Sequence, residues 1–289
     1  AAPTKGGYTF IGWAADGGTA PYDFSTAVTA DLTLTAQWQA NEYTVTYVMP
    51  GGTSSTEQIT YGNPVTYPDV SGKDGFTWAW YTDSNFTTPA SDSLTMPACG
   101  LTVYGQWTHT ASGLKGEGTQ DNPFLISTAD EFAAIGSTSI QQAIINNTNY
   151  YFVLANDIDY KPTETINYFN GTLDGKGHSI QVSADGGADT IFGYSLWDVT
   201  FQDITFVQMS ETLVSLAWHY NAYTAYQGEV LFQGITFTSG KSQDFVHDMP
   251  SYGKSQFGSN VMGKVRFIDC TNEVSYNLDP GTGDYMGIF

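Results

Sequence analysis

A group of oxygen-bearing side chains in the middle of the chain could bind a cation. Asn156, Asp157 and Asp159 are close in sequence, and Asp121 and Asn122 could join them. Carboxylate and amide oxygens are the ligands that Ca²⁺ prefers. The sequence has neither EF-hand spacing nor a nonapeptide repeat, so solvated carboxylates and Asx turns are the favoured alternative. Calcium is therefore a candidate cofactor, with Asn156, Asp157 and Asp159 as its predicted ligands.

The densest aromatic stretch is the predicted ligand-binding site. It reads WHYNAYTAY over residues 218–226, and the flat faces of aromatic rings suit stacking on sugars. The alternative is that some rings line a core while others shield a strand edge, although three tyrosines outside a core would be unusual. The predicted contacts with a glycan are made by Trp218, Tyr220, Tyr223 and Tyr226.

Four further carboxylates invite comparison with glycoside hydrolysis. That reaction needs two carboxyl groups about 5 to 9 Å apart. The sequence gives no means of pairing the candidates, so no catalytic residue is predicted from them. The four are Asp185, Asp189, Asp198 and Asp203.

The charge balance excludes several kinds of partner. Nine basic residues stand against 29 acidic ones, which gives a net charge of −20. Binding to nucleic acid or to an anionic membrane depends on Lys and Arg, so neither partner is expected. No apolar run approaches the roughly 18 residues that span a bilayer, so no membrane insertion is expected. Cys99 and Cys270 are predicted to be buried free thiols rather than a disulfide.

Residues 1–107 contain an internal repeat. Both copies end in alternating apolar and polar residues, which is typical of a half-buried strand. Only the second copy has an upstream half, in which Tyr43–Val48 alternates and Pro50–Gly52 marks a turn. The first copy is therefore expected to be incomplete, or to pair its exposed edge with something else. The matching pairs are Gly7–Phe10 with Gly75–Trp78, Trp13 with Trp80, Leu32–Leu34 with Leu101–Val103, and Gln37–Trp38 with Gln106–Trp107.

This repeat resembles the Listeria–Bacteroides repeat, the B-repeat of internalin-type surface proteins. The resemblance implies small β-grasp-like modules that form part of a stalk on a bacterial surface. It predicts a partial repeat at 1–40 and a complete repeat at 41–108. The residues that match the family pattern are Tyr43, Val45, Thr46, Gly51, Gly52, Tyr61, Gly62, Trp80 and Trp107.

A second domain is predicted over residues 114–289. Thr128 and Glu131 form a capping box that starts a short helix, and short β segments follow. Val199–Phe206 resembles Val230–Phe237, including the string Phe-Gln-x-Ile-Thr-Phe, and Val265–Thr271 is a weaker third copy. Offsets of 31 and 35 residues predict successive coils with loops of unequal length. The solenoid is expected to continue beyond residue 289.

The beginning of this domain resembles pectate-lyase-like and GLUG-type β-helix proteins. The resemblance rests on GEGTQDNPFLISTADEF, NDID and GTLDGKGHSI within residues 116–180. It implies a right-handed parallel β-helix with an N-terminal capping helix, in a family that includes adhesins and polysaccharide lyases. The predicted fold class is therefore mostly β: tandem β-grasp-like repeats followed by a parallel β-helix.

The resemblance draws attention to Asp174, Lys176 and His178. Lyases of this fold use a basic residue together with acidic calcium ligands. The same residues also suit a tight turn, because Asp and Gly adopt the backbone conformations that turns require. We favour the turn, since this turn chemistry also serves families that have no enzymatic activity.

The sequence thus predicts a non-enzymatic fragment of an extracellular, bacterial cell-surface adhesin or stalk protein. Its expected partner is a glycan or another ligand on a host or bacterial surface. One alternative is a secreted polysaccharide lyase or glycoside hydrolase that uses the β-helix groove. The other is a purely structural spacer.

Overall fold

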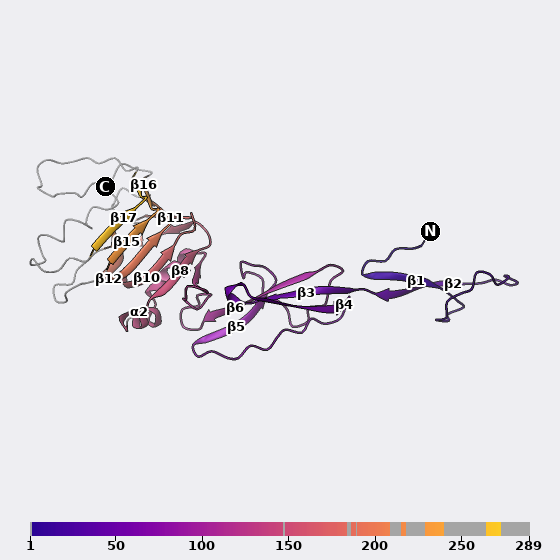
Figure 1. The fold of residues 1–289 in the computed structure, drawn as a ribbon. Helices are drawn as coiled ribbons and strands as arrows, with labels where there is room; N and C mark the ends of the chain where they lie inside the picture. Colours follow the sequence, from indigo (N-terminus) through magenta and orange to yellow (C-terminus); the bar gives the residue numbers. More distant parts are fainter. Residues whose placement is uncertain are drawn as a thin grey trace, which may run out of the picture. The chain divides into compact units, whose positions relative to one another are not determined.

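A computed structural model describes residues 2–146, 148–183, 186–188, 190–208, 215–217, 229–239 and 264–272. The chain separates into two compact units, both built mostly from β-strands (Figure 1). The first unit comprises Ala1–Gly72 and Trp78–Gln106. The second comprises the short loop Lys73–Thr77 together with Trp107–Phe289.

The first repeat is a two-stranded antiparallel sheet. Strand β1 (Tyr8–Ala15) pairs with β2 (Leu34–Ala40), and a bulge shifts the register between Phe10 and Gly12. The Phe10 ring packs edge-on against Trp13 and Trp38, with ring centroids 5.4 and 5.6 Å apart. This aromatic group gives the hairpin a small apolar face, although a two-stranded sheet alone is marginally stable.

The second repeat is a four-stranded sheet. Its strands are β3 (Glu42–Val48), β4 (Ser54–Thr60), β5 (Phe76–Tyr81) and β6 (Leu101–His109), in the order β4-β3-β6-β5. Strands β3 and β4 are antiparallel, whereas β3 and β6 are parallel. The one-turn 3₁₀ helix Pro50–Gly52 joins β3 to β4, as the Pro-Gly-Gly turn predicts. The buried core consists of Val45, Tyr47, Ile59, Val65, Trp80, Met96 and Val103.

The thiols are both free, but the prediction that both are buried is wrong. Cys99 is exposed and Cys270 is partly buried. Met96, which is 1% exposed, supplies the core side chain of this loop. Cys99 lies three residues further on, outside that core.

A short helical segment follows the first strand of the second unit. Strand β7 (Phe124–Ile126) leads into α1 (Ala129–Ala133), a 3₁₀ turn (Ala134–Gly136) and α2 (Thr138–Ile145). Thr128 Oγ1 accepts a hydrogen bond from the Glu131 N–H at 3.2 Å, which confirms the predicted N-cap. The Glu131 carboxylate reaches back to accept from the Ser127 N–H at 2.7 Å.

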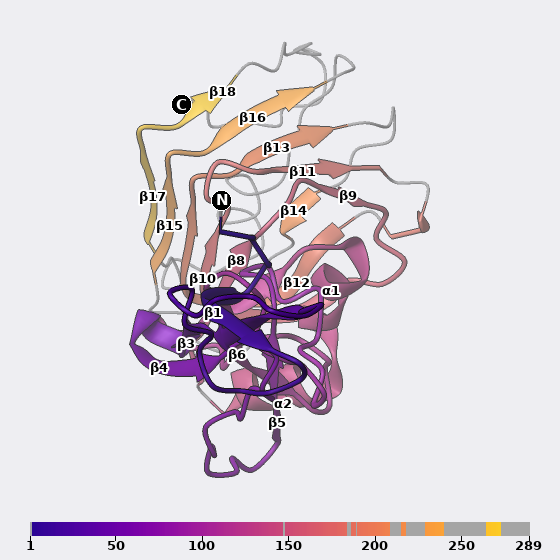
Figure 2. The same cartoon turned by 90° about the vertical axis from the view of Figure 1, so that its right-hand side faces the viewer.

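From residue 150 onward the chain alternates between two parallel sheets (Figure 2). One has the order β17-β15-β12-β10-β8-β7, with β14 paired to β12, and the other has the order β18-β16-β13-β11-β9. Each pair of neighbouring strands within these two orders is parallel. The strands are β8 (Tyr150–Leu154), β9 (Ile158–Tyr160), β10 (Ile166–Asp174), β11 (Ser179–Val182), β12 (Thr190–Gln202), β13 (Thr205–Gln208), β14 (Ser215–Ala217), β15 (Glu229–Gln233), β16 (Thr236–Ser239), β17 (Lys264–Ile268) and β18 (Thr271–Asn272).

The repeated strings of this unit lie on adjacent strands and pair with one another residue by residue. Phe201 pairs with Phe232 and Phe206 with Phe237, as their alignment predicts. The rings stack in the core: the Phe201–Phe232 and Phe232–Phe267 centroids are 5.3 and 4.9 Å apart, with interplanar angles of 17° and 8°. Full burial of a ring such as Phe201 or Phe232 stabilises the fold by roughly 1.5 to 3 kcal/mol. Identical residues recur because each strand presents the same ring to the strand beside it.

Helix α2 is attached to β10 by one buried glutamine. Gln141 Nε2 donates to the backbone oxygens of Ile135 and Tyr168, both at 2.9 Å, and Gln141 Oε1 accepts from the Tyr168 N–H at 2.8 Å. Strand β8 pairs with β10 only from Gly171 onward. The Gln141 amide therefore satisfies the Tyr168 backbone groups as a neighbouring strand would.

Candidate functional site

Four turns between the parallel sheets form a continuous row. We call residues 174–178, 202–204, 233–235 and 268–270 the turn row. Backbone bonds join the first three turns: Gly177 N donates to Asp203 O at 2.8 Å, and Asp203 N donates to Gln233 O at 3.0 Å. Gly234 N then donates to Ile268 O at 2.9 Å. The turns stack because the strands on both sides of each one pair in register.

Asp174 lies at the first turn of the row, and its carboxylate is fully engaged. Oδ1 accepts from the Lys176 N–H at 2.9 Å, while Oδ2 accepts from Lys176 Nζ at 2.6 Å and Gln202 Nε2 at 2.7 Å. Burial by itself would raise the pKa of Asp174, but the hydrogen bonds and charge of Lys176 and the bond from Gln202 lower it overall. Asp174 is thus a turn-stabilising anion whose oxygens already have partners.

His178 lies two residues beyond Lys176 and contacts a different carboxylate. Asp157 Oδ1 accepts from the Ser179 N–H at 2.8 Å and is 3.3 Å from His178 Nδ1. The hydrogen bond from Ser179 is the main cause of the lowered pKa of Asp157. The structure therefore brings Asp157 and His178 together and keeps Asp174 and Lys176 as a separate pair.

The three predicted calcium ligands lie at the connection between β8 and β9. Asn156 Nδ2 donates to Ser127 O at 3.2 Å, and Asp157 bonds Ser179 as described above. Asp159 is exposed on β9. Within the described ranges, no group of three or more His, Cys, Asp or Glu residues is arranged to hold a metal ion. Calcium at Asn156, Asp157 and Asp159 stays a prediction.

The aromatic stretch and some of the predicted carboxylates lie outside the described residues. This applies to Trp218, Tyr220, Tyr223 and Tyr226, and to Asp185 and Asp189. The side chain of Asp198 is also outside the described part. Strand β14 ends at Ala217, directly before Trp218, and Ala217 pairs with Phe192 of β12.

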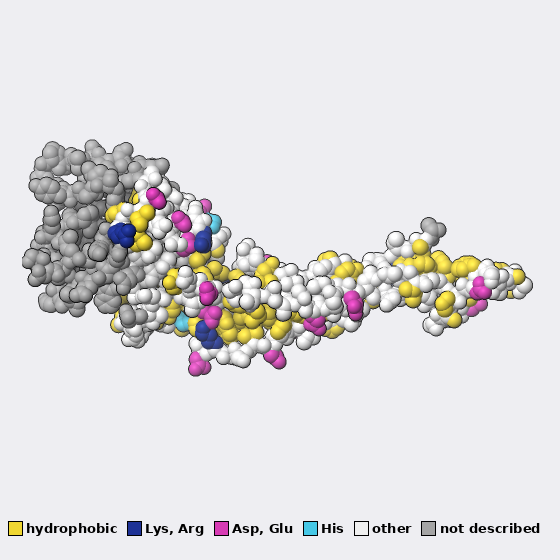
Figure 3. Space-filling view, viewed as in Figure 1, with side chains coloured by type: hydrophobic (Ala, Val, Ile, Leu, Met, Phe, Trp, Pro, Cys, Tyr) yellow, Lys and Arg dark blue, Asp and Glu magenta, His cyan; other side chains and the backbone are white. Residues whose placement is uncertain are grey.

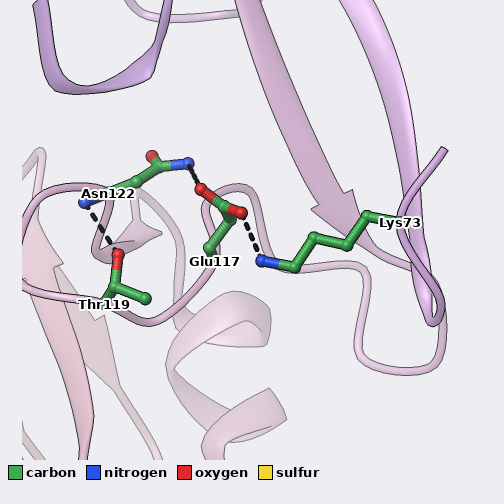
Figure 4. A network of polar contacts seen from close by, with 4 residues as sticks. All are labelled: Lys73, Glu117, Thr119 and Asn122. Atoms are coloured by element: carbon green, nitrogen blue, oxygen red, sulfur yellow. Dashed lines mark hydrogen bonds and ion pairs between the residues drawn. The ribbon is translucent and has the colours of Figure 1, made fainter. Parts of the chain in front are cut away.

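A polar network at the start of the second unit was not predicted from the sequence (Figure 4). Lys73 Nζ contacts Glu117 Oε1, and Asn122 Nδ2 donates to Glu117 Oε2 at 2.9 Å. The Asn122 N–H donates to Thr119 Oγ1 at 3.1 Å. Burial alone would raise the pKa of Glu117, but the bonds from Lys73 and Asn122 and the charge of Lys73 lower it overall. Asn122, suggested as an additional calcium ligand, thus fixes the loop at 117–122.

Lys73 begins a short turn in which its ammonium group lies over an aromatic ring. Lys73 Nζ is 4.7 Å from the centroid of Phe76, and the Phe76 N–H donates to Lys73 O at 3.1 Å. Gly75 O accepts from the N–H of Thr110, the residue after β6, at 2.9 Å. A cation over an aromatic face stabilises such a turn by about 0.5 to 1 kcal/mol at an exposed position.

The first repeat contains the same turn. Lys5 Nζ is 3.9 Å from the centroid of Tyr8, and the Tyr8 N–H donates to Lys5 O at 3.1 Å. Gly7 O accepts from the N–H of Asn41, the residue after β2, at 2.9 Å. The Tyr8 ring meets Tyr61 edge-on at 5.3 Å. The aligned glycines were a sequence signal for this turn, but the two lysines were not connected with it.

The turn at residues 5–8 and the turn at residues 73–76 occupy the same position in the two repeats. Residues 1–37 and 43–106 match the family model of the Listeria-Bacteroides repeat domain. This match supports the resemblance that the sequence indicates for the repeats.

Comparison with curated proteins gives partial similarity. The chain is 37% identical over 128 residues to Internalin H of Listeria monocytogenes. This match covers 42% of this chain and 23% of Internalin H. It is 35% identical over 109 residues to a protein of Evansella cellulosilytica named "Putative membrane protein", covering 36% of this chain and 16% of that protein. The chain thus spans less than a quarter of these relatives. No solved structure matches the chain.

No helix among the described residues is long and apolar enough to cross a membrane.

Proposed function

We propose that the chain is a non-enzymatic part of a bacterial cell-surface protein that displays an adhesive domain. In this proposal the Listeria-Bacteroides repeats are β-grasp-like stalk modules. The observation that carries it is the combination of the two repeats, matched over residues 1–37 and 43–106, with the similarity to Internalin H. The proposed location is extracellular, on the cell surface.

The proposal assigns a right-handed parallel β-helix to residues 114–289. Support comes from the alternation of successive strands between two parallel sheets, each with its neighbours in sequence order. Connections between parallel strands of one sheet are right-handed in about 98% of known cases. Helix α2 and its Gln141 contacts support a capping function at the beginning of the coil.

The turn row supports the non-enzymatic assignment over a lyase or hydrolase. Asp174 already accepts three hydrogen bonds, and the nearest basic side chain, Lys176, is its ion-pair partner. General acid–base catalysis needs a group that can reach a substrate proton within hydrogen-bonding distance. Incubation with a panel of polysaccharides should therefore release no unsaturated products and no reducing ends. Release of either product would favour the enzymatic alternative.

Surface display and adhesion have separate tests. Antibodies against residues 1–106 should label intact cells of the producing bacterium, and protease treatment of those cells should remove the label.

A glycan array with the purified chain tests adhesion. Binding should be lost in the double variant Trp218→Ala/Tyr223→Ala and kept in Phe24→Ala, which removes an aromatic ring that is 66% exposed elsewhere. If antibodies label the cell surface but the glycan array shows no binding, the result would favour the alternative in which the chain is a structural spacer.

A further inference from the structure

One carboxylate of the second unit holds an amine and a carboxamide at its two oxygens. Lys73 Nζ contacts Glu117 Oε1, and Asn122 Nδ2 donates to Glu117 Oε2 at 2.9 Å (Figure 4). All three residues belong to the second unit, to which the segment Lys73–Thr77 contributes separately from the rest. A nucleophile beside a group that can take its proton is the arrangement that covalent chemistry between side chains requires.

The carboxamide is held in place by the loop around it. Asn122 is 6% exposed. Its N–H donates to Thr119 Oγ1 at 3.1 Å, and its backbone oxygen accepts from the Glu117 N–H at 2.9 Å. A reaction between neighbouring groups is faster when their positions are fixed in advance. The side chain that would be attacked is therefore already positioned beside the carboxylate.

The amine reaches the same carboxylate from a turn of the second repeat. The Lys73 ammonium is 4.7 Å from the centroid of Phe76, and Gly75 O accepts from the Thr110 N–H at 2.9 Å. The Lys73 side chain is 40% exposed, whereas that of Glu117 is 19% exposed. The flexible four-carbon stem of a lysine lets its amine move. The amine can thus pass from the carboxylate to the amide carbon that the same carboxylate holds.

The equivalent turn of the first repeat gives an internal comparison. Lys5 Nζ is 3.9 Å from the centroid of Tyr8 and 5.9 Å from that of Trp38. Within the described ranges its ammonium contacts these rings and has no carboxylate partner. The lysine and its aromatic ring are therefore common to both turns, whereas the carboxylate and the carboxamide are specific to the second.

We propose that Lys73 and Asn122 form an isopeptide bond, an amide bond between two side chains, with Glu117 as the group that transfers protons. Glu117 takes a proton from the Lys73 ammonium, and the free amine attacks Asn122 Cγ. The Nζ–Cγ bond forms and the Cγ–Nδ2 bond breaks. Glu117 carries two protons in turn from Nζ to Nδ2, which leaves as an ammonium ion. An ammonium group and a carboxamide thus become a secondary amide and an ammonium ion, without an oxidant or any other reactant.

The bond closes a covalent loop over residues 73–122, which contains β5 and β6. Tension applied to the two chain ends then passes through the bonded side chains, so these two strands no longer carry it. Until the bond forms, the site is held by the ion pair and the hydrogen bonds alone. An ion pair at an exposed lysine contributes little by itself.

The test is the mass of the complete 289-residue chain. Bond formation should lower it by about 17 Da, the mass of ammonia. Incubation at about pH 9 should increase the converted fraction, because lysine amines are protonated at neutral pH. Lys and Arg side chains are sparse on the face drawn in Figure 3, and the chain has nine in all, so trypsin gives few peptides. Trypsin does not cut after an acylated lysine, so residues 6–115 should stay in one piece, joined to the peptide that begins at Gly116.

Three variants assign the chemistry to these residues. Lys73→Arg and Glu117→Gln should keep the full mass, because the first lacks a nucleophilic amine and the second lacks the base. Lys5→Arg, at the equivalent turn, should lose ammonia as the wild type does. Circular dichroism shows whether each variant is folded.

Three results would overturn the proposal. The first is an unchanged mass of the wild type after incubation. The second is a loss of about 17 Da that maps to an asparagine other than Asn122. The third is an equal loss in folded Lys73→Arg or Glu117→Gln.

Discussion

The carboxylate of Asp203 lies against the backbone of Gly234 in the next turn. A Cβ atom added at Gly234 would be 2.5 Å from Asp203 Oδ1. Both residues have left-handed backbone conformations, with φ of 52° and 62°, and Asp269 of the following turn has φ of 52°. The Asp203 carboxylate therefore occupies space that a side chain at position 234 would need.

The substitution Gly234→Ala should lower the free energy of unfolding of the second unit by about 1 to 3 kcal/mol. Part of this cost is the left-handed conformation, which is unfavourable for residues with a Cβ atom by about 1 to 2 kcal/mol. The rest is the collision with Asp203. Urea denaturation, followed by tryptophan fluorescence, measures the sum.

Two further variants separate these contributions. Gly177→Ala lies in the same row at φ of 86°, but a Cβ atom there meets nothing within 4 Å, so only the backbone cost should appear. The double variant Asp203→Gly/Gly234→Ala, compared with Asp203→Gly alone, should recover the part that is due to collision, because Gly keeps the left-handed conformation of residue 203 without strain. Equal losses for Gly234→Ala with and without Asp203 would show that the carboxylate has no effect.

The Phe-Gln-x-Ile-Thr-Phe string shows how much of the second unit could be predicted from the sequence. The conserved letters are the stacked rings and paired strands, which is why an alignment of the string predicted the register. The position marked x holds Asp203 in one copy and Gly234 in the next. Asp and Gly are among the few residues that adopt left-handed conformations readily, so the turn was also present in the pattern.

Other parts could not be predicted, because their partners are distant in sequence. Asp174, Lys176 and His178 are neighbours in the chain, yet His178 contacts Asp157 and Asp174 contacts Gln202. Gln141 gives no local signal, since its partner Tyr168 is 27 residues away. Such contacts depend on which strands lie side by side in the two parallel sheets, which local spacing does not specify.

Replacing Gln141 by Met should destabilise the second unit by about 2 to 4 kcal/mol, because buried backbone groups of Ile135 and Tyr168 would lose their hydrogen bonds. Thermal unfolding measured by circular dichroism checks this. Gln142→Met is the matched control, since Gln142 is exposed on the same helix and should change stability by less than about 0.5 kcal/mol. Similar losses for both variants would contradict the assigned function of Gln141.

Stability should fall in alkaline solution because of Tyr160. This side chain is 4% exposed and packs against Phe132, and burial raises its pKa from 10.0 to about 12. A pKa that is higher in the folded state stabilises the fold fully below pH 10 and loses that contribution between pH 10 and about 12.

The contribution of Tyr160 is about 2 kcal/mol, since each pKa unit corresponds to about 1.4 kcal/mol and some screening is expected. Unfolding free energies measured from pH 8 to 12 should decline less in Tyr160→Phe than in the wild type. Tyr151→Phe keeps Tyr160 and should retain the full decline. An unchanged decline in Tyr160→Phe would assign the effect to another group.

The stability of the loop at 117–122 should depend more on the side-chain amide of Asn122 than on the ion pair between Lys73 and Glu117. The Lys73 side chain is 40% exposed, so Lys73→Met should cost less than about 1 kcal/mol. Asn122 is buried, and its replacement removes the side-chain amide that donates to Glu117 Oε2, so Asn122→Ala should cost about 1 to 3 kcal/mol.

Acid titration gives an independent check on this network. The pKa of Glu117 is lowered in the folded protein. The carboxylate of Glu117 therefore contributes fully to stability above pH 4.5, and this contribution is lost as the pH falls through the lowered pKa. Lys73→Met should raise the pKa of Glu117, which NMR titration of the carboxyl carbon measures. An unshifted pKa in that variant would mean that Lys73 and Glu117 do not interact in solution, and the loop would then be held by Asn122 and Thr119 alone.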